Sequence, residues 1–177
     1  LLPRKAMNEL LRMANEAGEE DRLLFSADEN HLFFQVGERL LLSRKLSGNF
    51  PDFERVLPKE HPNKMSLNRE ELKAALERVM QFADERSRAI KMRAADGGVM
   101  LHSSLSDTGE SEEALSIEYG GPKVEIGFNA QYLLEFLRAC EEAEVNFLFK
   151  DAASAGEMQP TGDGTLQYRY IVMPMRI

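Results

Sequence analysis

Three segments of the sequence repeat one layout, a short apolar strand, an amphipathic helix and then strand-like runs, and this repetition constrains the fold most strongly. The helical segments begin near residues 2, 67 and 128, at offsets of 65 and 61 residues. These offsets are too long for common solenoid repeats and fit a module of one helix and about four strands. The helices carry apolar stripes at 3.6-residue spacing: Met7, Leu10, Leu11 and Ala14; Leu72, Ala75, Leu76, Val79 and Met80; and Leu133, Phe136, Leu137 and Cys140.

The helix starts also match one another. Asn68 is a candidate N-cap with Glu71 three residues later, which is the arrangement of a capping box, and Asn129 stands at the equivalent place in the third segment. Pro3 occupies that place in the first segment, where the start of a helix tolerates proline.

Strand-like runs bounded by turn residues follow each helix. We expect strands near residues 23–25, 32–36, 40–43, 90–92, 99–101, 115–119, 145–149 and 166–175. The acidic stretch before the sixth of these runs, with Glu110, Glu112 and Glu113, is predicted to be an exposed loop. Residues 49–63 contain Pro51, Pro58 and Pro62, so we interpret them as a linker that lies on the surface. The pattern predicts an α+β fold.

Composition excludes several classes of protein. The chain of 177 residues has 22 Lys and Arg against 30 Asp and Glu, a net charge of -8. This charge excludes a small, strongly basic nucleic-acid binder and a polybasic membrane module. Cys140 is the single cysteine and cannot form an internal disulfide, so we expect an intracellular, cytoplasmic protein. The sequence has no apolar run of about 18 residues and therefore no predicted membrane span. It begins without a methionine or a signal peptide, and we expect it to be part of a longer protein.

No catalytic or metal-binding motif stands out. The sequence contains no phosphate-binding loop, dinucleotide glycine fingerprint or zinc-protease motif. The three histidines are scattered without metal-ligand spacing, so we expect no metal and no cofactor. His102, Ser103, Ser104 and Asp107 form the one cluster that would suit a small hydrolase, but a strand end that runs into a polar loop explains it as well. We expect a protein that is not an enzyme.

Two stretches closely resemble the bacterial replicative sliding clamp, the beta subunit of DNA polymerase III. They are SGNFPDFERVLP at residues 47–58 and YIVMPMRI at residues 170–177. LPRK at residues 2–5 and IGFN at residues 126–129 are similar as well, and the likeness covers nearly the whole chain in order. The resemblance implies a DNA-clamp (processivity) fold, in which a ring of two subunits has three domains per subunit and two modules per domain.

The resemblance also implies a division of this chain. Residues 1–48 would be the second half of the middle clamp domain, and residues 49–63 the linker between domains. Residues 64–177 would be the complete C-terminal domain. The chain would thus hold three modules, one half-domain and one complete domain.

The resemblance assigns three groups of site residues. Arg4 and Lys5 match positions implicated in contact with DNA, while Arg69, Lys73 and Arg138 are weaker candidates because glutamates lie among them. Phe82, Glu110, Glu112 and Glu113 match the subunit interface, although a solvated acidic loop explains the glutamates equally well. A peptide-binding pocket between the middle and last domains would be formed by Pro51, Arg55, Val56, Ser87, Asn129, Tyr132, Ala153, Ala155, Ile171, Val172, Met173, Pro174, Met175, Arg176 and Ile177. Ser87, Ala153 and Ala155 depart from the family pattern, in which larger residues or hydroxyls occur.

The function implied is that of a sliding clamp that encircles double-stranded DNA without sequence preference and tethers the replicative polymerase. Its expected partners are the catalytic subunit of DNA polymerase III, the clamp loader, other proteins with clamp-binding motifs, and a second clamp subunit in the full-length homodimer. No membrane partner is expected. The alternative function is that of a peptide-binding adaptor that does not contact DNA.

Overall fold

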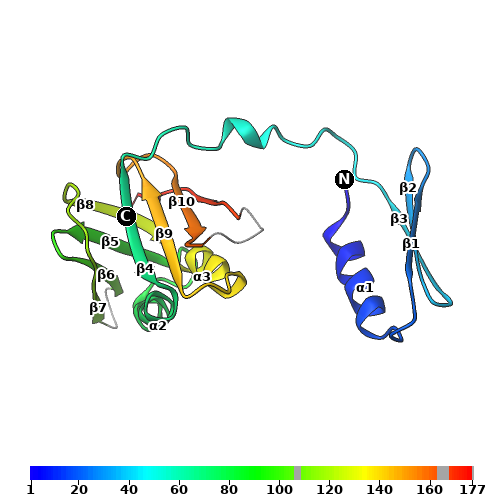
Figure 1. The fold of residues 1–177 in the computed structure, drawn as a ribbon, viewed down its shortest axis with the longest axis horizontal. Helices are drawn as coiled ribbons and strands as arrows, with labels where there is room; N and C mark the ends of the chain where they lie inside the picture. The colour runs from blue at the N-terminus through cyan, green and yellow to red at the C-terminus, as the bar shows by residue number, and fades with distance from the viewer. Residues whose placement is uncertain (106–108, 163–167, 177) are drawn as a thin grey trace. The chain divides into compact units, whose positions relative to one another are not determined.

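The computed structural model describes residues 1–105, 109–162 and 168–176. The chain divides into two compact units, an N-terminal unit of Leu1–Phe53 and a C-terminal unit of Glu54–Ile177. The division falls inside the predicted linker of residues 49–63. Figure 1 shows the elements of both units, and each unit is treated by itself below.

The N-terminal unit, which is described throughout, consists of helix α1 (Arg4–Asn15) and strands β1 (Leu23–Ala27), β2 (His31–Val36) and β3 (Arg39–Arg44). The strands form an antiparallel sheet in the order β1-β2-β3. A small core of Leu10, Met13, Leu32, Phe34 and Val36 joins the helix to the sheet. Gly37, in the β2–β3 turn, has a φ of +58°, which glycine adopts without strain.

The buried stripe of α1 differs from the predicted one. The structure buries Ala6, Leu10 and Met13, whereas Met7 and Leu11 are 42% and 62% exposed. Of the apolar stripe read from the sequence, Leu10 is buried, and Ala14 is exposed like Met7 and Leu11. Every residue of β1 is also exposed. The N-terminal unit therefore buries less apolar surface than its composition would allow.

The C-terminal unit contains two modules of the same layout, each a strand, a helix and three further strands among the described residues. The first module has β4 (Asn63–Asn68), α2 (Arg69–Val79), β5 (Ala89–Ala95), β6 (Gly98–Leu105) and β7 (Gly109–Ser116). The second has β8 (Val124–Asn129), α3 (Ala130–Ala139), β9 (Glu144–Phe149), β10 (Gly156–Pro160) and β11 (Tyr170–Val172). Two short 3-10 helices, η1 (Phe53–Arg55) and η2 (Met80–Phe82), precede β4 and follow α2. This α+β layout agrees with the predicted repeat.

The two modules exchange their first strands. The described sheets have the orders β11-β10-β9-β4 and β7-β6-β5-β8. Strand β4 of the first module thus pairs with β9 of the second, and β8 of the second pairs with β5 of the first. Helices α2 and α3 contact one another (Figure 1). Neither module could keep this arrangement without the other.

One core joins both modules of the C-terminal unit. It contains the predicted stripes of α2 and α3, including Leu76 and Phe136, which have no exposed surface. The rings of Phe128 and Phe147, from β8 and β9, pack edge to face with centroids 5.5 Å apart. Asn68 caps α2 by accepting a hydrogen bond from the backbone N–H of Glu71 at 3.1 Å, as predicted.

Two strands of the C-terminal unit differ from the prediction. Glu110, Glu112 and Glu113 lie in β7 rather than in a loop, because β7 pairs with β6 along its whole length. Strand β10 was missed because Gly156 and Pro160 disfavour a strand in sequence. Gly156 is required there, since a Cβ atom would lie 2.7 Å from Cζ of Phe147. Of the predicted strand at 166–175, residues 166–167 lie outside the described part of the chain.

In the part of the chain that the structure describes, no helix is long and apolar enough to cross a membrane.

The shared core predicts a large cost for truncating Leu76. Leu76→Ala removes a fully buried side chain and should lower the free energy of unfolding of the C-terminal unit by about 3 kcal/mol. The neighbouring Glu77→Ala removes a half-exposed side chain that pairs with Arg138 and should cost less than about 0.5 kcal/mol. Urea denaturation followed by circular dichroism measures both values. Equal effects of the two substitutions would contradict the described core.

Candidate binding pocket and charged surfaces

A pocket of about 510 Å³ lies on the C-terminal unit. Three segments contribute to it: the stretch that precedes β4, the loop that follows β9, and the C-terminal run after β11. Its lining residues are Arg55, Val56, Leu57, Pro58, Lys59, Glu60, Lys150, Ala153, Ser154, Ala155 and Met173. Val56 and Met173 are 63% and 65% exposed, so the pocket presents two apolar side chains to solvent.

The loop after β9 is held in a defined shape by Asp151. The Oδ1 atom of Asp151 accepts hydrogen bonds from the backbone N–H groups of Ala153 at 2.9 Å and Ser154 at 2.8 Å. These bonds, the one from Ala153 foremost, hold the pKa of Asp151 below its usual value. The loop therefore presents Ala153, Ser154 and Ala155 to the pocket in a fixed arrangement.

The C-terminal run is anchored to both sheets. Strand β11 pairs with β10, with Val172 opposite Gly156. Three residues later, the backbone N–H of Met175 donates a hydrogen bond to the carbonyl oxygen of Gly127 on β8 at 2.7 Å. Met173 lies between these two attachments, so its exposed side chain is held at the edge of the pocket.

The structure brings together some of the residues that the resemblance assigned to a peptide pocket. Five of them line the cavity: Arg55, Val56, Ala153, Ala155 and Met173. Beside Met173, Val172 is buried in the core, and Ile171, Pro174 and Met175 are half-buried. Arg176 is exposed. Pro51 belongs to the N-terminal unit, and Ile177 lies outside the described residues.

Ser87, Asn129 and Tyr132 do not line this cavity. Asn129 caps α3 by accepting a hydrogen bond from the backbone N–H of Gln131 at 2.9 Å, and Tyr132 is exposed on the same helix. The backbone N–H of Ala130 donates to the carbonyl oxygen of Arg88, which follows Ser87. These three residues therefore gather around the start of α3, close to the strand that binds Met175.

Sequence reasoning missed six lining residues, namely Leu57, Pro58, Lys59, Glu60, Lys150 and Ser154. Leu57 and Ser154 adjoin predicted residues in the chain, and Pro58, Lys59 and Glu60 continue the stretch that follows Val56, so adjacency was a usable signal. Lys150 carried no such signal, because only the fold brings the end of β9 beside the stretch before β4. No ion pair joins Lys59 or Lys150 to another described residue, so both add positive charge to the pocket.

The predicted DNA contacts lie at the first turn of α1. That turn contains Arg4 and Lys5, has no acidic residue, and is preceded by Pro3, which offers no side-chain cap. Helix α2 instead begins with Glu70 and Glu71, which suits the positive end of a helix dipole. Arg4 and Lys5 form no ion pair with any described residue. They therefore concentrate positive charge where the helix dipole already favours an anion.

The weaker candidates are neutralised by neighbouring carboxylates. Arg69 and Lys73 both pair with Glu70, at 2.7 Å and 3.6 Å. Arg138 pairs with Glu77 at 3.0 Å. These pairs distinguish Arg4 and Lys5 from the other basic residues on the helices.

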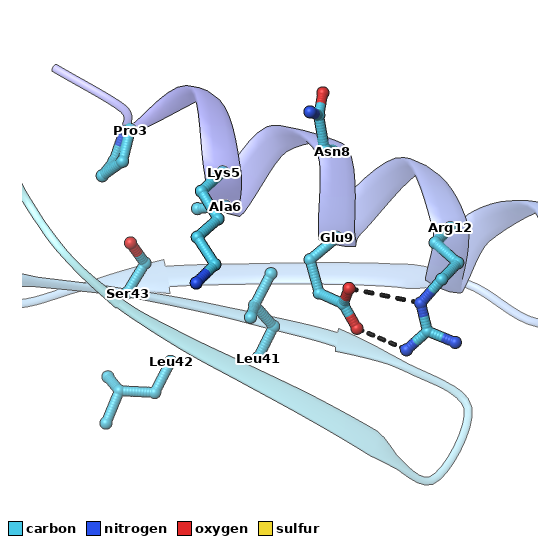
Figure 2. Close-up of a pocket in the computed structure, with 9 residues that line it drawn as sticks. All are labelled: Pro3, Lys5, Ala6, Asn8, Glu9, Arg12, Leu41, Leu42 and Ser43. Atoms are coloured by element: carbon cyan, nitrogen blue, oxygen red, sulfur yellow. Dashed lines mark hydrogen bonds and ion pairs between the residues drawn. The ribbon is translucent and has the colours of Figure 1, made fainter.

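Lys5 also lines a cavity of about 610 Å³ between α1 and β3. Figure 2 shows Lys5 on the helix above Leu41 and Leu42, and the pair formed by Glu9 and Arg12 one turn later. Of the charged residues that line the cavity, Glu9 and Arg12 pair with one another, and Lys5 has no partner of opposite charge among the described residues. The cavity is lined by both apolar and charged side chains.

The residues assigned to a subunit interface gather at the start and middle of β7. Phe82 lies in η2, and a Cβ atom on Gly109 would be 3.9 Å from its ring. Glu113 accepts two hydrogen bonds from Arg78, at 2.6 Å and 2.8 Å, which lower its pKa. Glu112 lies 3.3 Å from Nδ1 of His102. Strand β7 lies at the edge of its sheet. Among the described strands it therefore pairs on one side only, and its other side could pair with a further strand.

The geometry does not support the hydrolase alternative. Ser103 is buried, and its hydroxyl donates to the carbonyl oxygen of Val79 at 2.5 Å. His102 precedes Ser103 in strand β6, so the two side chains lie on opposite faces of the sheet. Asp107 lies outside the described residues. The described histidines, cysteine and acidic residues form no group of three that could hold a metal ion.

Comparison with known proteins identifies the family. The family model for the DNA polymerase III beta subunit, C-terminal domain, matches residues 54–176. The beta sliding clamp of Proteus mirabilis is 32% identical over 177 residues, which are 100% of this chain and 47% of the relative. The chain thus spans about half the length of the curated relatives that it matches.

Solved structures agree with this comparison. A sliding clamp from Pseudomonas aeruginosa bound to griselimycin has a TM-score of 0.87 and 31% identity, over 99% of this chain and 47% of that chain. A Caulobacter crescentus beta sliding clamp crystallised with PEG has a TM-score of 0.91 and 30% identity, over 99% of this chain and 46% of that chain. With a family model that covers most of its length and structural agreement over both units, the chain belongs to the family of the DNA polymerase III beta subunit, the bacterial sliding clamp.

Proposed function

We propose that this chain is part of a sliding clamp that encircles duplex DNA and tethers the replicative polymerase for processive synthesis. In this proposal residues 1–48 are the second half of the middle domain, and residues 64–177 are the complete C-terminal domain. The observation that carries the proposal is the pocket of exposed Val56 and Met173 on a C-terminal unit of clamp fold. The clamp would act by topology and by docking, without a cofactor and without catalysis.

Docking would occur when a short peptide segment of a partner inserts into the pocket. Its apolar walls, formed by Val56, Leu57, Pro58 and Met173, are suited to bind an aliphatic or aromatic anchor. Met173 can adapt to varied side chains because its thioether is flexible and polarizable. The small Ala153 and Ala155 leave a wide floor. The catalytic subunit of DNA polymerase III, the clamp loader and other proteins with clamp-binding motifs would share this site by turns.

The same pocket is the proposed site for griselimycin in this chain. The support is the Pseudomonas aeruginosa relative, which was crystallised with that compound. Griselimycin therefore serves as a probe of the pocket that does not depend on knowing the natural partner.

Contact with DNA would involve the phosphates and Arg4 and Lys5. Phosphate contacts carry no sequence information, which suits a ring that must slide. The chain as a whole is acidic, with a net charge of -8, so DNA would be repelled from its other surfaces. The clamp would lie in the cytoplasm with the replicating DNA.

Ring closure would use the edge of β7. Its open side and the half-buried Phe82 would meet a second subunit in the full-length homodimer, with Glu110, Glu112 and Glu113 in the charged part of that interface. An edge strand beside an apolar side chain is a surface that another chain can extend.

The second candidate function is that of a peptide-binding adaptor without DNA contact. The acidic net charge favours it, because nonspecific binding to DNA usually requires a basic surface. The pocket would serve both functions equally, so DNA binding distinguishes them.

The pocket predicts that Met173→Ala weakens ligand binding. Removal of the exposed thioether from the pocket wall should raise the Kd for griselimycin and for a polymerase-tail peptide about tenfold. Met100→Ala on β6, which changes a half-buried methionine that does not line the pocket, should change the Kd less than about twofold. Isothermal titration calorimetry on the 177-residue chain measures both. Unchanged binding in Met173→Ala would remove the pocket from the proposal.

The DNA contact predicts a change in salt dependence. In the full-length clamp, Arg4→Glu with Lys5→Glu should abolish retention on circular duplex DNA at moderate salt and reduce the slope of log K against log salt by about 2. Lys64→Glu with Lys123→Glu changes the net charge equally on exposed lysines and should leave the slope nearly unchanged. Retention measured by gel filtration across a salt series tests this. Equal slopes for the two double variants would favour the adaptor.

A further inference from the structure

Glu157 is a buried carboxylate that none of the functions above uses. It lies in β10, and its side chain has no exposed surface. Its neighbours in the strand, Gly156 and Met158, face the core near Phe147. Because side chains alternate along a strand, Glu157 lies on the opposite face of the sheet, away from that core.

Three side chains bind the Glu157 carboxylate. Nη2 of Arg169 donates a hydrogen bond to Oε2 at 2.6 Å, and Nε of the same residue donates to Oε1. Gln159 donates to Oε1 from the same strand. Nε2 of His61 lies 2.9 Å from Oε2 and is the donor there, because an ionised carboxylate can only accept.

Burial by itself raises the pKa of Glu157, but the hydrogen bonds from Arg169, Gln159 and His61 outweigh it and lower the pKa to about 2. The carboxylate is therefore charged at neutral pH. Its loss would leave Nε2 of the largely buried His61 without its acceptor, which is costly at a buried site, whereas the partly exposed Arg169 could turn to water.

The partners of Glu157 are close in sequence to residues that line the pocket. His61 directly follows Lys59 and Glu60, which line the pocket. Arg169 directly precedes β11, which leads to Met173. Glu157 itself comes two residues after Ala155 in the floor. One carboxylate thus connects all three pocket segments.

Backbone pairing holds these walls weakly. No backbone hydrogen bond joins residues 57–62 to the rest of the C-terminal unit in the described ranges, and pairing in β4 begins at Asn63. Strand β11 has three residues at the edge of its sheet. Nδ1 of His61 has no hydrogen-bond partner within the described structure, so Glu157 provides the sole polar attachment of that ring.

We infer that Glu157 is a positioning residue of the ligand pocket, which acts through His61 and Arg169 to hold the segment of residues 56–60 and the C-terminal run at the spacing a ligand requires. The inference rests on the proposed function of the pocket. It assigns to Glu157, which does not line the pocket, a role in affinity.

The test replaces Glu157 with glutamine, which keeps the size of the side chain and removes its charge. In the 177-residue chain, Glu157→Gln should raise the Kd for griselimycin about tenfold. Amide hydrogen exchange of residues 56–60 and 171–173 should accelerate, while that of α2 stays unchanged. The matched control is Glu125→Gln on β8, which removes a half-exposed carboxylate that pairs with Arg93 and should change the Kd less than about twofold.

Variants of His61 distinguish positioning from a general loss of stability. His61→Ala should weaken binding about threefold, whereas His61→Gln keeps a donor and should restore most of the affinity. His61→Ala should have no further effect in the Glu157→Gln background, because both changes break one connection. If Glu157→Gln fails to fold, the inference is tested by the affinities of His61→Ala and His61→Gln for griselimycin. Equal affinities of these two variants would overturn the inference.

The outcomes separate the inference from the proposed function. If the wild-type chain binds neither griselimycin nor a polymerase-tail peptide, the proposed function is contradicted. The inference is then tested by the hydrogen exchange of residues 56–60 and 171–173 alone. Wild-type binding with unchanged affinity and exchange in Glu157→Gln overturns the inference and leaves the proposed function intact.

Discussion

The exchange of strands β4 and β8 between two modules is the interaction on which the C-terminal unit depends. Each first strand completes the sheet of the other module, so a single core must form from both at once. The exchange also determines where the pocket can be. Strands β4 and β11 belong to the same sheet. The segment that leads into β4 carries Val56, the segment that follows β11 carries Met173, and both residues line one pocket.

The N-terminal unit illustrates what the module lacks without such an exchange. Strands β5 and β9 each have a neighbour on both sides, whereas β1, their counterpart, pairs with β2 alone among the described strands. Leu23, Leu24 and Phe25 are consequently exposed. The same local sequence pattern thus yields a buried strand in one setting and an open edge in the other, because burial depends on the partner strand.

Charged side chains are placed in two opposite ways in this chain. Arg4 and Lys5 oppose the usual preference of a helix start for acidic residues, and a local rule that is broken without compensation is typical of a functional position. Glu157 is the opposite case, since a buried charge is compensated by three partners. The charges of Arg4 and Lys5 thus remain available to a ligand, whereas the charge of Glu157 is compensated within the protein.

The helices, their caps, the module repeat and the family could be predicted from the residues alone, because periodicity, capping and motif are local properties of the chain. Five pocket residues could be predicted as well, and they lie in two distinctive stretches and one loop. The fold was needed to show that Glu110 to Glu113 form an edge strand, that Met7 and Leu11 remain exposed, and that Lys150 joins the pocket. The role of Glu157 likewise required the fold, since His61 and Arg169 reach it from distant parts of the chain. Strand pairing, burial and charge compensation all depend on contacts between segments that are distant in the sequence, and a local sequence pattern does not specify those contacts.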